Sequence, residues 1–195
     1  MHWLGRHLRQ TQDKGTILQP DKGKCLEVHV DANFTGNWDP KEPEKDSGTA
    51  HSRHGHITTY AGCPMLWKSQ LQTKIALSSC ESKHTGRSHF LHDTTPIMNM
   101  LKEMKARGFP MHAAKAAVHC KVFKDDSGAL EIAKVHKFRP QTKHLNAKSH
   151  HFRSCVDTDQ VTMHKASAHD QRADHLTKPA TWEILKIHRK EIMGW

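Results

Sequence analysis

The stretch LEVHVDAN, residues 26–33, carries the pattern on which the fold prediction rests. Its apolar residues Leu26, Val28 and Val30 alternate with polar ones, which is the period of a half-buried β-strand. The strand ends on Asp31, just before the chain turns, so its carboxylate is expected at the rim of a sheet. An aspartate there can serve a metal or cap the following turn through its side chain, and capping is the commoner role for an isolated case.

Length and composition limit the classes of protein that come into question. A chain of 195 residues fits one domain with extensions, although its 35% hydrophobic residues fall below the share usual for globular domains. The formal net charge of +10 favours an acidic polymer as partner, and a basic surface without a partner is an equal alternative.

Cysteine usage and the N-terminal residues indicate where the protein acts. The five cysteines are odd in number and form no CxxC pair, which argues against a disulfide framework or a structural zinc site. The start MHWLGRHLRQTQ has no apolar core of a signal peptide, and no run approaches the roughly 18 apolar residues that span a bilayer. We expect a soluble intracellular protein, cytoplasmic or nuclear, without a membrane partner.

The chain contains 19 histidines, which are scattered and lack an HExxH motif. Most are expected at the surface. A His-rich metal-binding protein is a less favoured alternative, because it requires histidines that converge in space.

Hydrophobic periodicity and turn signals predict alternating strands and helices. Strands are expected over 25–31, 57–61, 65–69, 117–123 and 160–164, and helices over 79–92, 95–107, 127–134 and 168–176. Further helical segments are expected at the basic N-terminus, through Phe152 and Val156, and within 180–195. The first three strands would form an antiparallel meander, and the order as a whole suits an α/β fold with a mixed sheet.

Four acidic residues fall at comparable places in this layout: Asp31 ends the first strand, Glu81 opens the first helix of the core, Asp125 ends the fourth strand, and Asp174 lies in the last predicted core helix. Two divalent cations about 3.5–4 Å apart can clamp the attacking water and the leaving oxygen of a phosphodiester. Mg²⁺ takes oxygen ligands, so carboxylates alone suffice. The spacing is weak evidence by itself, because 20 acidic residues offer many sets of four.

The same blocks carry a family resemblance. VDANFTGNW, ALSSCES, KVFKDDSGALEIAK, QTKHLNAKSHHFR and QRADHLTKP resemble, in order and spacing, the ribonuclease H domain of copia-type retrotransposon Pol polyproteins. The resemblance covers roughly residues 24–179, and WLGRHLRQTQDKGTILQP resembles the end of the preceding reverse-transcriptase region. It implies a ribonuclease H-like, mixed five-stranded sheet flanked by helices. The expected parts are a remnant of the upstream region or linker (1–23), the ribonuclease H-like domain (24–179) and a helical tail (180–195).

The resemblance also implies a function and its residues. Asp31, Glu81, Asp125 and Asp174 would be the catalytic set that binds two Mg²⁺ ions, with Mn²⁺ as a substitute. The substrate would be the RNA strand of an RNA–DNA hybrid, and other retroelement Pol products are possible partners. In an enzyme of this kind, basic residues would contact phosphates, namely Lys134, Lys137, Arg139, Lys143, Lys148 and Arg153. For any one of them a solvated face is an equal alternative. His164 and His169 are weaker candidates for proton transfer, and a surface role is commoner for them.

Several positions depart from the family pattern. Ser82, Lys83 and His84 follow Glu81 where a small residue, an acid and Tyr are usual, and Lys124 places a cation beside Asp125. The alternative function is therefore a truncated, catalytically impaired retroelement remnant with at most weak nucleic-acid binding.

Overall fold

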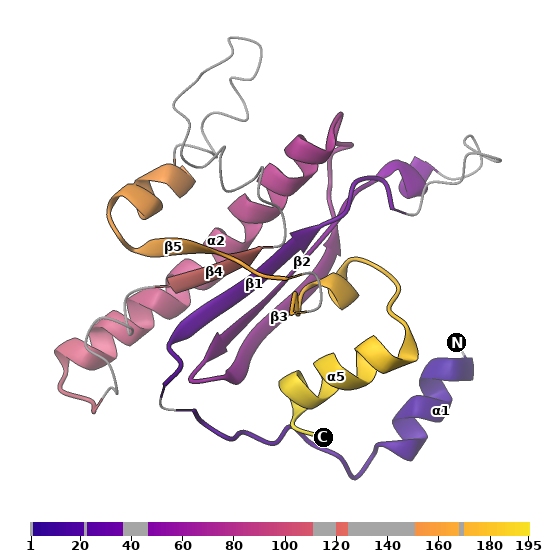
Figure 1. Cartoon of the computed structure of the whole chain (residues 1–195), viewed down its shortest axis with the longest axis horizontal. Helices are drawn as coiled ribbons and strands as arrows, with labels where there is room; N and C mark the ends of the chain where they lie inside the picture. The colour runs from indigo at the N-terminus through magenta and orange to yellow at the C-terminus, as the bar shows by residue number, and fades with distance from the viewer. Residues whose placement is uncertain (1, 22, 37–46, 111–119, 125–150, 168–169) are drawn as a thin grey trace.

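A five-stranded mixed sheet forms the centre of the molecule in the computed structural model (Figure 1). The structure describes residues 2–21, 23–36, 47–110, 120–124, 151–167 and 170–195. The strands lie in the order β3-β2-β1-β4-β5. They are β1 (Leu26–Ala32), β2 (Arg53–Tyr60), β3 (Cys63–Leu71), β4 (Cys120–Lys124) and β5 (Val161–Lys165).

The first three strands are consecutive and antiparallel, whereas β4 and β5 run parallel to β1. The hairpin between β2 and β3 closes with a two-residue turn at Ala61 and Gly62, whose φ angles of 51° and 75° suit the strand twist. The predicted meander and mixed α/β sheet are confirmed. Both hairpin strands are longer than the predicted 57–61 and 65–69, since β2 begins at Arg53 and β3 runs from Cys63 to Leu71.

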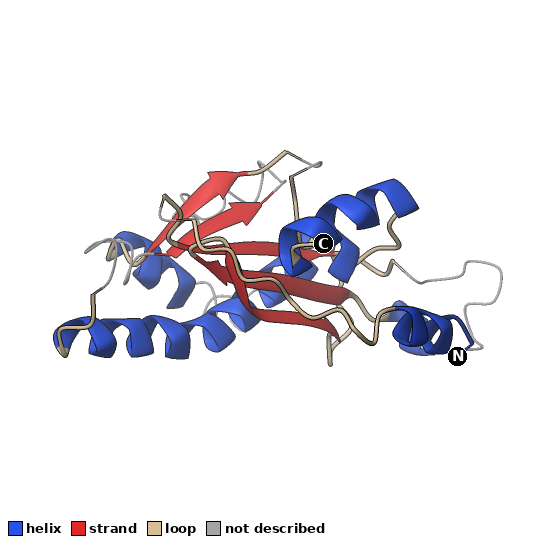
Figure 2. Ribbon diagram, turned by 90° about the horizontal axis from the view of Figure 1, so that it is seen from below, coloured by secondary structure: helices blue, strands red, loops and turns tan. Residues whose placement is uncertain are grey.

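Helices cover both faces of the sheet (Figures 1 and 2). The long helix α2 (Ser79–Ala106) packs on one face against β1 and β2, and residues 151–157 form a further helical segment. The short 3-10 helix η3 (Asp174–Leu176) and the helix α5 (Trp182–Met193) lie on the opposite face. The other described elements are α1 (His2–Gln10) and the 3-10 helix η1 (Ser47–Ala50).

The strand β1 is buried along its whole length. Its alternation predicts one buried face, but the strand is central and both of its faces are covered. One face meets α2 in the hydrophobic core, which consists of Leu26, Val28, Val30, Phe90, Leu91, Met98, Leu101, Val122, Phe152 and Val161. The other face carries Glu27, His29 and Asp31, and η3 packs against it near Asp31.

Residues 79–106 form one helix, so the prediction of two helices that meet near Thr95 is wrong. Pro96 lies inside the helix, where it removes one hydrogen bond and costs about 3 kcal/mol. The buried side chains of Phe90 and Leu91 precede it and those of Met98 and Leu101 follow it. Burying each such side chain contributes about 1.5–3 kcal/mol, which together outweighs the cost of the proline.

The segment after β5 also differs from the prediction. In place of a helix over 168–176, the described residues contain turns and the three-residue helix η3. Polar side chains hold this segment against the sheet, as described below. The terminal helix predicted within 180–195 is confirmed as α5, which begins after the N-cap Thr181. Among the described helices, none is both long and apolar enough to cross a membrane.

Candidate active site

Asp31 lies on the face of the sheet that meets η3. It pairs with Gly55 on β2, so both residues point to the same side. A Cβ at Gly55 would lie 2.5 Å from Leu176 Cβ and 3.2 Å from Thr177 Cγ2. Only glycine therefore lets the segment around η3 approach the sheet closely enough to reach Asp31.

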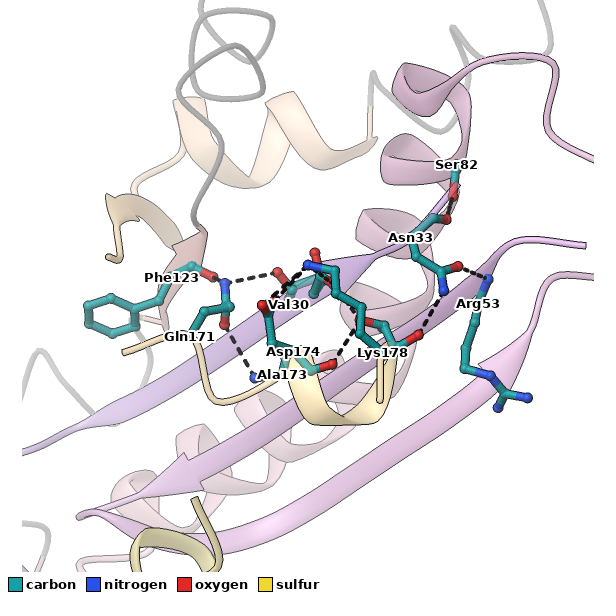
Figure 3. A network of polar contacts seen from close by, with 11 residues as sticks. Val30, Asn33, Arg53, Ser82, Phe123, Gln171, Ala173, Asp174 and Lys178 are labelled. Atoms are coloured by element: carbon teal, nitrogen blue, oxygen red, sulfur yellow. Dashed lines mark hydrogen bonds and ion pairs between the residues drawn. The ribbon is translucent and has the colours of Figure 1, made fainter. Parts of the chain in front are cut away.

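Gln171 attaches the start of this segment to the sheet. Its buried side-chain amide donates to the carbonyl oxygens of Val30 on β1 and Phe123 on β4, at 3.3 Å each (Figure 3). The amide thus bridges two parallel strands near their carboxyl ends. This is the edge at which ligands of open α/β sheets commonly bind.

Asn33 and Ser69 attach the end of the segment. Asn33 Nδ2 donates to the Thr177 carbonyl oxygen at 2.7 Å, and Ser69 Oγ donates to the Leu176 carbonyl oxygen at 2.6 Å. Asn33 also joins this segment to β2 and α2, because its Oδ1 accepts from the Arg53 amide and its carbonyl oxygen accepts from Ser82 Oγ (Figure 3). These contacts fix η3 over the end of β1.

As a result, Asp31 and Asp174 both form an ion pair with the ammonium group of Lys178. Lys178 Nζ lies 3.4 Å from Asp31 Oδ2 and 3.2 Å from each carboxylate oxygen of Asp174. The hydroxyl of Thr177 donates to Asp31 Oδ2. The Asp31 side chain is only 3% exposed, so Lys178 and Thr177 compensate a buried carboxylate.

Glu81 is not brought into this pair. Its Oε2 accepts from the Leu77 amide at 2.9 Å, while Ser78 Oγ accepts from the Glu81 amide at 3.1 Å. Such reciprocal bonds close the first turn of a helix, and the Ser-x-x-Glu spacing encodes them. Gly86 of the same helix faces the Ala32 side chain, so α2 covers the face of β1 opposite to Asp31.

Most of the other predicted site residues lie outside the described residues. Asp125 does, as do Lys134, Lys137, Arg139, Lys143, Lys148 and His169. Arg153 is half-buried in the helical segment 151–157. His164 is half-buried on β5, with its ring 5.4 Å from that of Phe123. Within the described residues, no group of three or more His, Cys, Asp or Glu side chains could hold a metal ion.

The residues that surround the carboxylate pair were missed by the sequence analysis. Thr177 and Lys178 stand in the quoted block QRADHLTKP, and Asn33 stands in VDANFTGNW. The four-residue spacing from Asp174 to Lys178 is a signal that could have indicated their ion pair. No local signal indicates that Lys178 also reaches Asp31.

Most histidines are expected at the surface, but four of those in the described part of the chain are buried: His29, His54, His56 and His188. Burial lowers the pKa of His54 and of His56 to about 4 and that of His29 to about 3. The ring nitrogens of His54 and His56 have no hydrogen-bond partner among the described residues. These side chains are therefore neutral components of the interior.

Two curated proteins are similar to the chain over most of its length. A retrovirus-related Pol polyprotein from transposon TNT 1-94 of Nicotiana tabacum is 25% identical over 192 residues, which cover 98% of this chain and 13% of that protein. One from transposon RE2 of Arabidopsis thaliana is 27% identical over 185 residues, or 91% of this chain and 11% of that protein. The chain thus spans about an eighth of the length of these relatives. No family model matches it.

Among solved structures, LC11-RNase H1, isolated from compost by a metagenomic approach, superposes with a TM-score of 0.53. The match covers 78% of this chain and 91% of that one, at 14% sequence identity. The fold is therefore that of ribonuclease H domains, and the homologues are copia-type retrotransposon Pol polyproteins, which confirms the resemblance.

Proposed function

We propose that this chain, which has the ribonuclease H fold and retrotransposon Pol relatives, hydrolyses the RNA strand of RNA–DNA hybrids. One observation carries the proposal: Asp31 and Asp174, far apart in the sequence, share one cationic partner at the end of the central strand. Carboxylates gathered there repel each other unless a cation compensates them, and here Lys178 does so. The two carboxylates therefore form a place that holds one cation between them, which supports a metal-binding role.

The proposed metal ligands are Asp31, Glu81, Asp125 and Asp174. The donors fit Mg²⁺ or Mn²⁺, because Asp31 and Asp174 already bind one cation together, and Mg²⁺ in proteins is often held by one or two carboxylates plus substrate phosphates. When bound, two such ions would supply an activated water and stabilise the leaving oxygen.

Residues of the chain itself would orient this site. Thr177 fixes Asp31 through its hydroxyl, and Asn33 and Gln171 hold the backbone that carries Asp174. Glu81 would contribute only after it exchanges its bond with the Leu77 amide for a ligand in the site.

Basic residues would bind the substrate. Lys137, Arg139, Lys143, Lys148 and Arg153 would contact phosphates, which makes the affinity fall steeply with salt. Preference for a hybrid would come from contacts to 2′-hydroxyls across a shallow minor groove. Residues 1–23 and 180–195 would flank the catalytic domain, 24–179, and other Pol products are proposed partners.

The capping bond of Glu81 favours a second candidate, the catalytically impaired remnant. Incubation of the chain with end-labelled RNA–DNA hybrid, single-stranded RNA and duplex DNA separates the two functions. We expect the RNA of the hybrid alone to be cut, in Mg²⁺ or Mn²⁺ and not in EDTA. No cleavage of the hybrid in either metal would contradict the enzyme function, and equal cleavage of single-stranded RNA would contradict the substrate.

A further inference from the structure

Lys178 occupies the point where the two described carboxylates converge. Its Nζ contacts the same Asp31 and Asp174 oxygens that would ligate a metal, at 3.4 Å and 3.2 Å. A hard divalent cation binds carboxylate oxygens at 2.0–2.6 Å. Both cations cannot keep full contact with these oxygens, because they are of like charge and would lie within a few ångström of each other.

The side chain of Lys178 can leave this position. It is 45% exposed, whereas the Asp31 side chain is 3% exposed and the Asp174 side chain is 26% exposed. A cavity of about 100 Å³ lies beside it and is lined in part by Lys178, Asp174 and Pro179. Lysine carries its charge on a flexible four-carbon stem, so the ammonium can move without the backbone.

Thr177 keeps Asp31 in place during such an exchange. Its hydroxyl bonds to Asp31 Oδ2 independently of Lys178, and its carbonyl oxygen accepts from Asn33 Nδ2. The carboxylates would then stay positioned while one cation replaces the other.

We propose that Lys178 is a built-in counter-cation that a divalent metal must displace from Asp31 and Asp174, so that this lysine sets the metal affinity of the site. The inference rests on the proposed function, since it requires that the carboxylates bind a metal. A lysine that only stabilised the fold would behave differently: its removal would lower the stability of the protein and leave the metal affinity unchanged.

Calorimetric titration of the full chain with Mn²⁺, after treatment with EDTA, tests this exchange. Lys178 is 45% exposed in both ion pairs, so solvent screens its attraction to the carboxylates. Lys178→Met is therefore expected to bind Mn²⁺ roughly three- to tenfold more tightly than the wild type. Lys178→Arg retains the charge and should bind no more tightly than the wild type. Lys190→Met, which removes an exposed lysine of α5, is the matched control and should leave the affinity unchanged.

Thermal unfolding gives a second readout. In EDTA, Lys178→Met should unfold at a lower temperature than the wild type, because Asp31 loses its cation, and Mn²⁺ should raise its Tm more than that of the wild type. If Lys178→Met does not fold in EDTA, Lys178→Gln replaces it, since an amide can still donate to the carboxylates.

The outcomes separate this inference from the proposed function. If the wild type binds Mn²⁺ and cuts the hybrid while the neutral variants bind Mn²⁺ equally or more weakly, the role of Lys178 alone is contradicted. If neither the wild type nor the neutral variants bind Mn²⁺, the metal site itself is contradicted, and both proposals fail.

Discussion

The Asp31→Asn variant should cut the RNA strand of a hybrid more than about 100-fold more slowly than the wild type, because it loses a proposed metal ligand rather than a supporting residue. The substitution preserves size and an oxygen that can accept the Thr177 hydroxyl bond. It removes the buried charge that contacts Lys178, and so weakens the attraction for any cation. The effect should therefore fall on turnover while the fold persists.

The matched control is Asp157→Asn, which removes an exposed carboxylate at the end of the helical segment 151–157. It should cleave at the wild-type rate, and circular dichroism of both variants should match that of the wild type. Equal cleavage by the wild type and a folded Asp31→Asn variant would contradict the assignment of Asp31. If the wild type has no activity above that of Asp31→Asn, the remnant function replaces the enzyme.

The free energy of unfolding should fall as the pH falls from about 6.5 to about 4, through the buried histidines. Burial and the neighbouring His89 lower the pKa of His54 to about 4, and burial lowers that of His56 to about 4 despite the opposing effect of Asp93. Burial and Arg172 lower the pKa of His29 to about 3. Each histidine titrates near 6.5 in the unfolded chain.

The sign follows from the protons bound by each state. Below pH 6.5 the unfolded chain binds protons that the folded chain excludes, so acid favours unfolding by about 1.4 kcal/mol per pH unit for each such histidine. The loss of stability levels off below the pKa that each histidine has in the folded chain, and it is absent above pH 6.5. Burial raises the pKa of Asp93, but the hydrogen bonds from Lys68 and His92 together with the nearby positive charge of Lys68 lower it overall. Asp93 therefore adds a loss of stability only at more acidic pH.

Urea unfolding at a series of pH values between 7.5 and 4 would measure this slope. In His54→Leu, the slope of the free energy of unfolding against pH should be smaller than in the wild type by the contribution of about one proton. His151→Asn, which changes an exposed histidine, should leave it unchanged. A wild-type stability that stays constant across this range would contradict the neutral, buried state of these histidines.

Sequence alone predicted the sheet because its signals are local. The alternation in Leu26–Ala32 predicts the first strand, and the hairpin pattern that follows predicts the next two strands and their pairing. The comparisons confirm the fold. It did not predict that β1 is buried on both faces, since burial of Glu27, His29 and Asp31 depends on what covers them. The continuity of α2 through Pro96 likewise depends on tertiary packing on both sides of the proline.

The carboxylate site was predictable in part. The blocks around Asp31 and Asp174 marked two residues that the fold brings together. The bond from Glu81 to Leu77 follows from a capping pattern that is visible in the sequence, but the competition between capping and ligation is not. The contact from Lys178 to Asp31 is set by how closely η3 approaches Gly55, which no local pattern encodes.

The measurement that tests the central claim most directly is a double-mutant cycle of Mn²⁺ binding with Asp31→Asn and Asp174→Asn. If both carboxylates serve one site, each single variant should lose most of the Mn²⁺ affinity, and the double variant should lose little more. Full Mn²⁺ binding in either folded single variant, or losses that simply add in the double variant, would contradict a shared site at the end of β1.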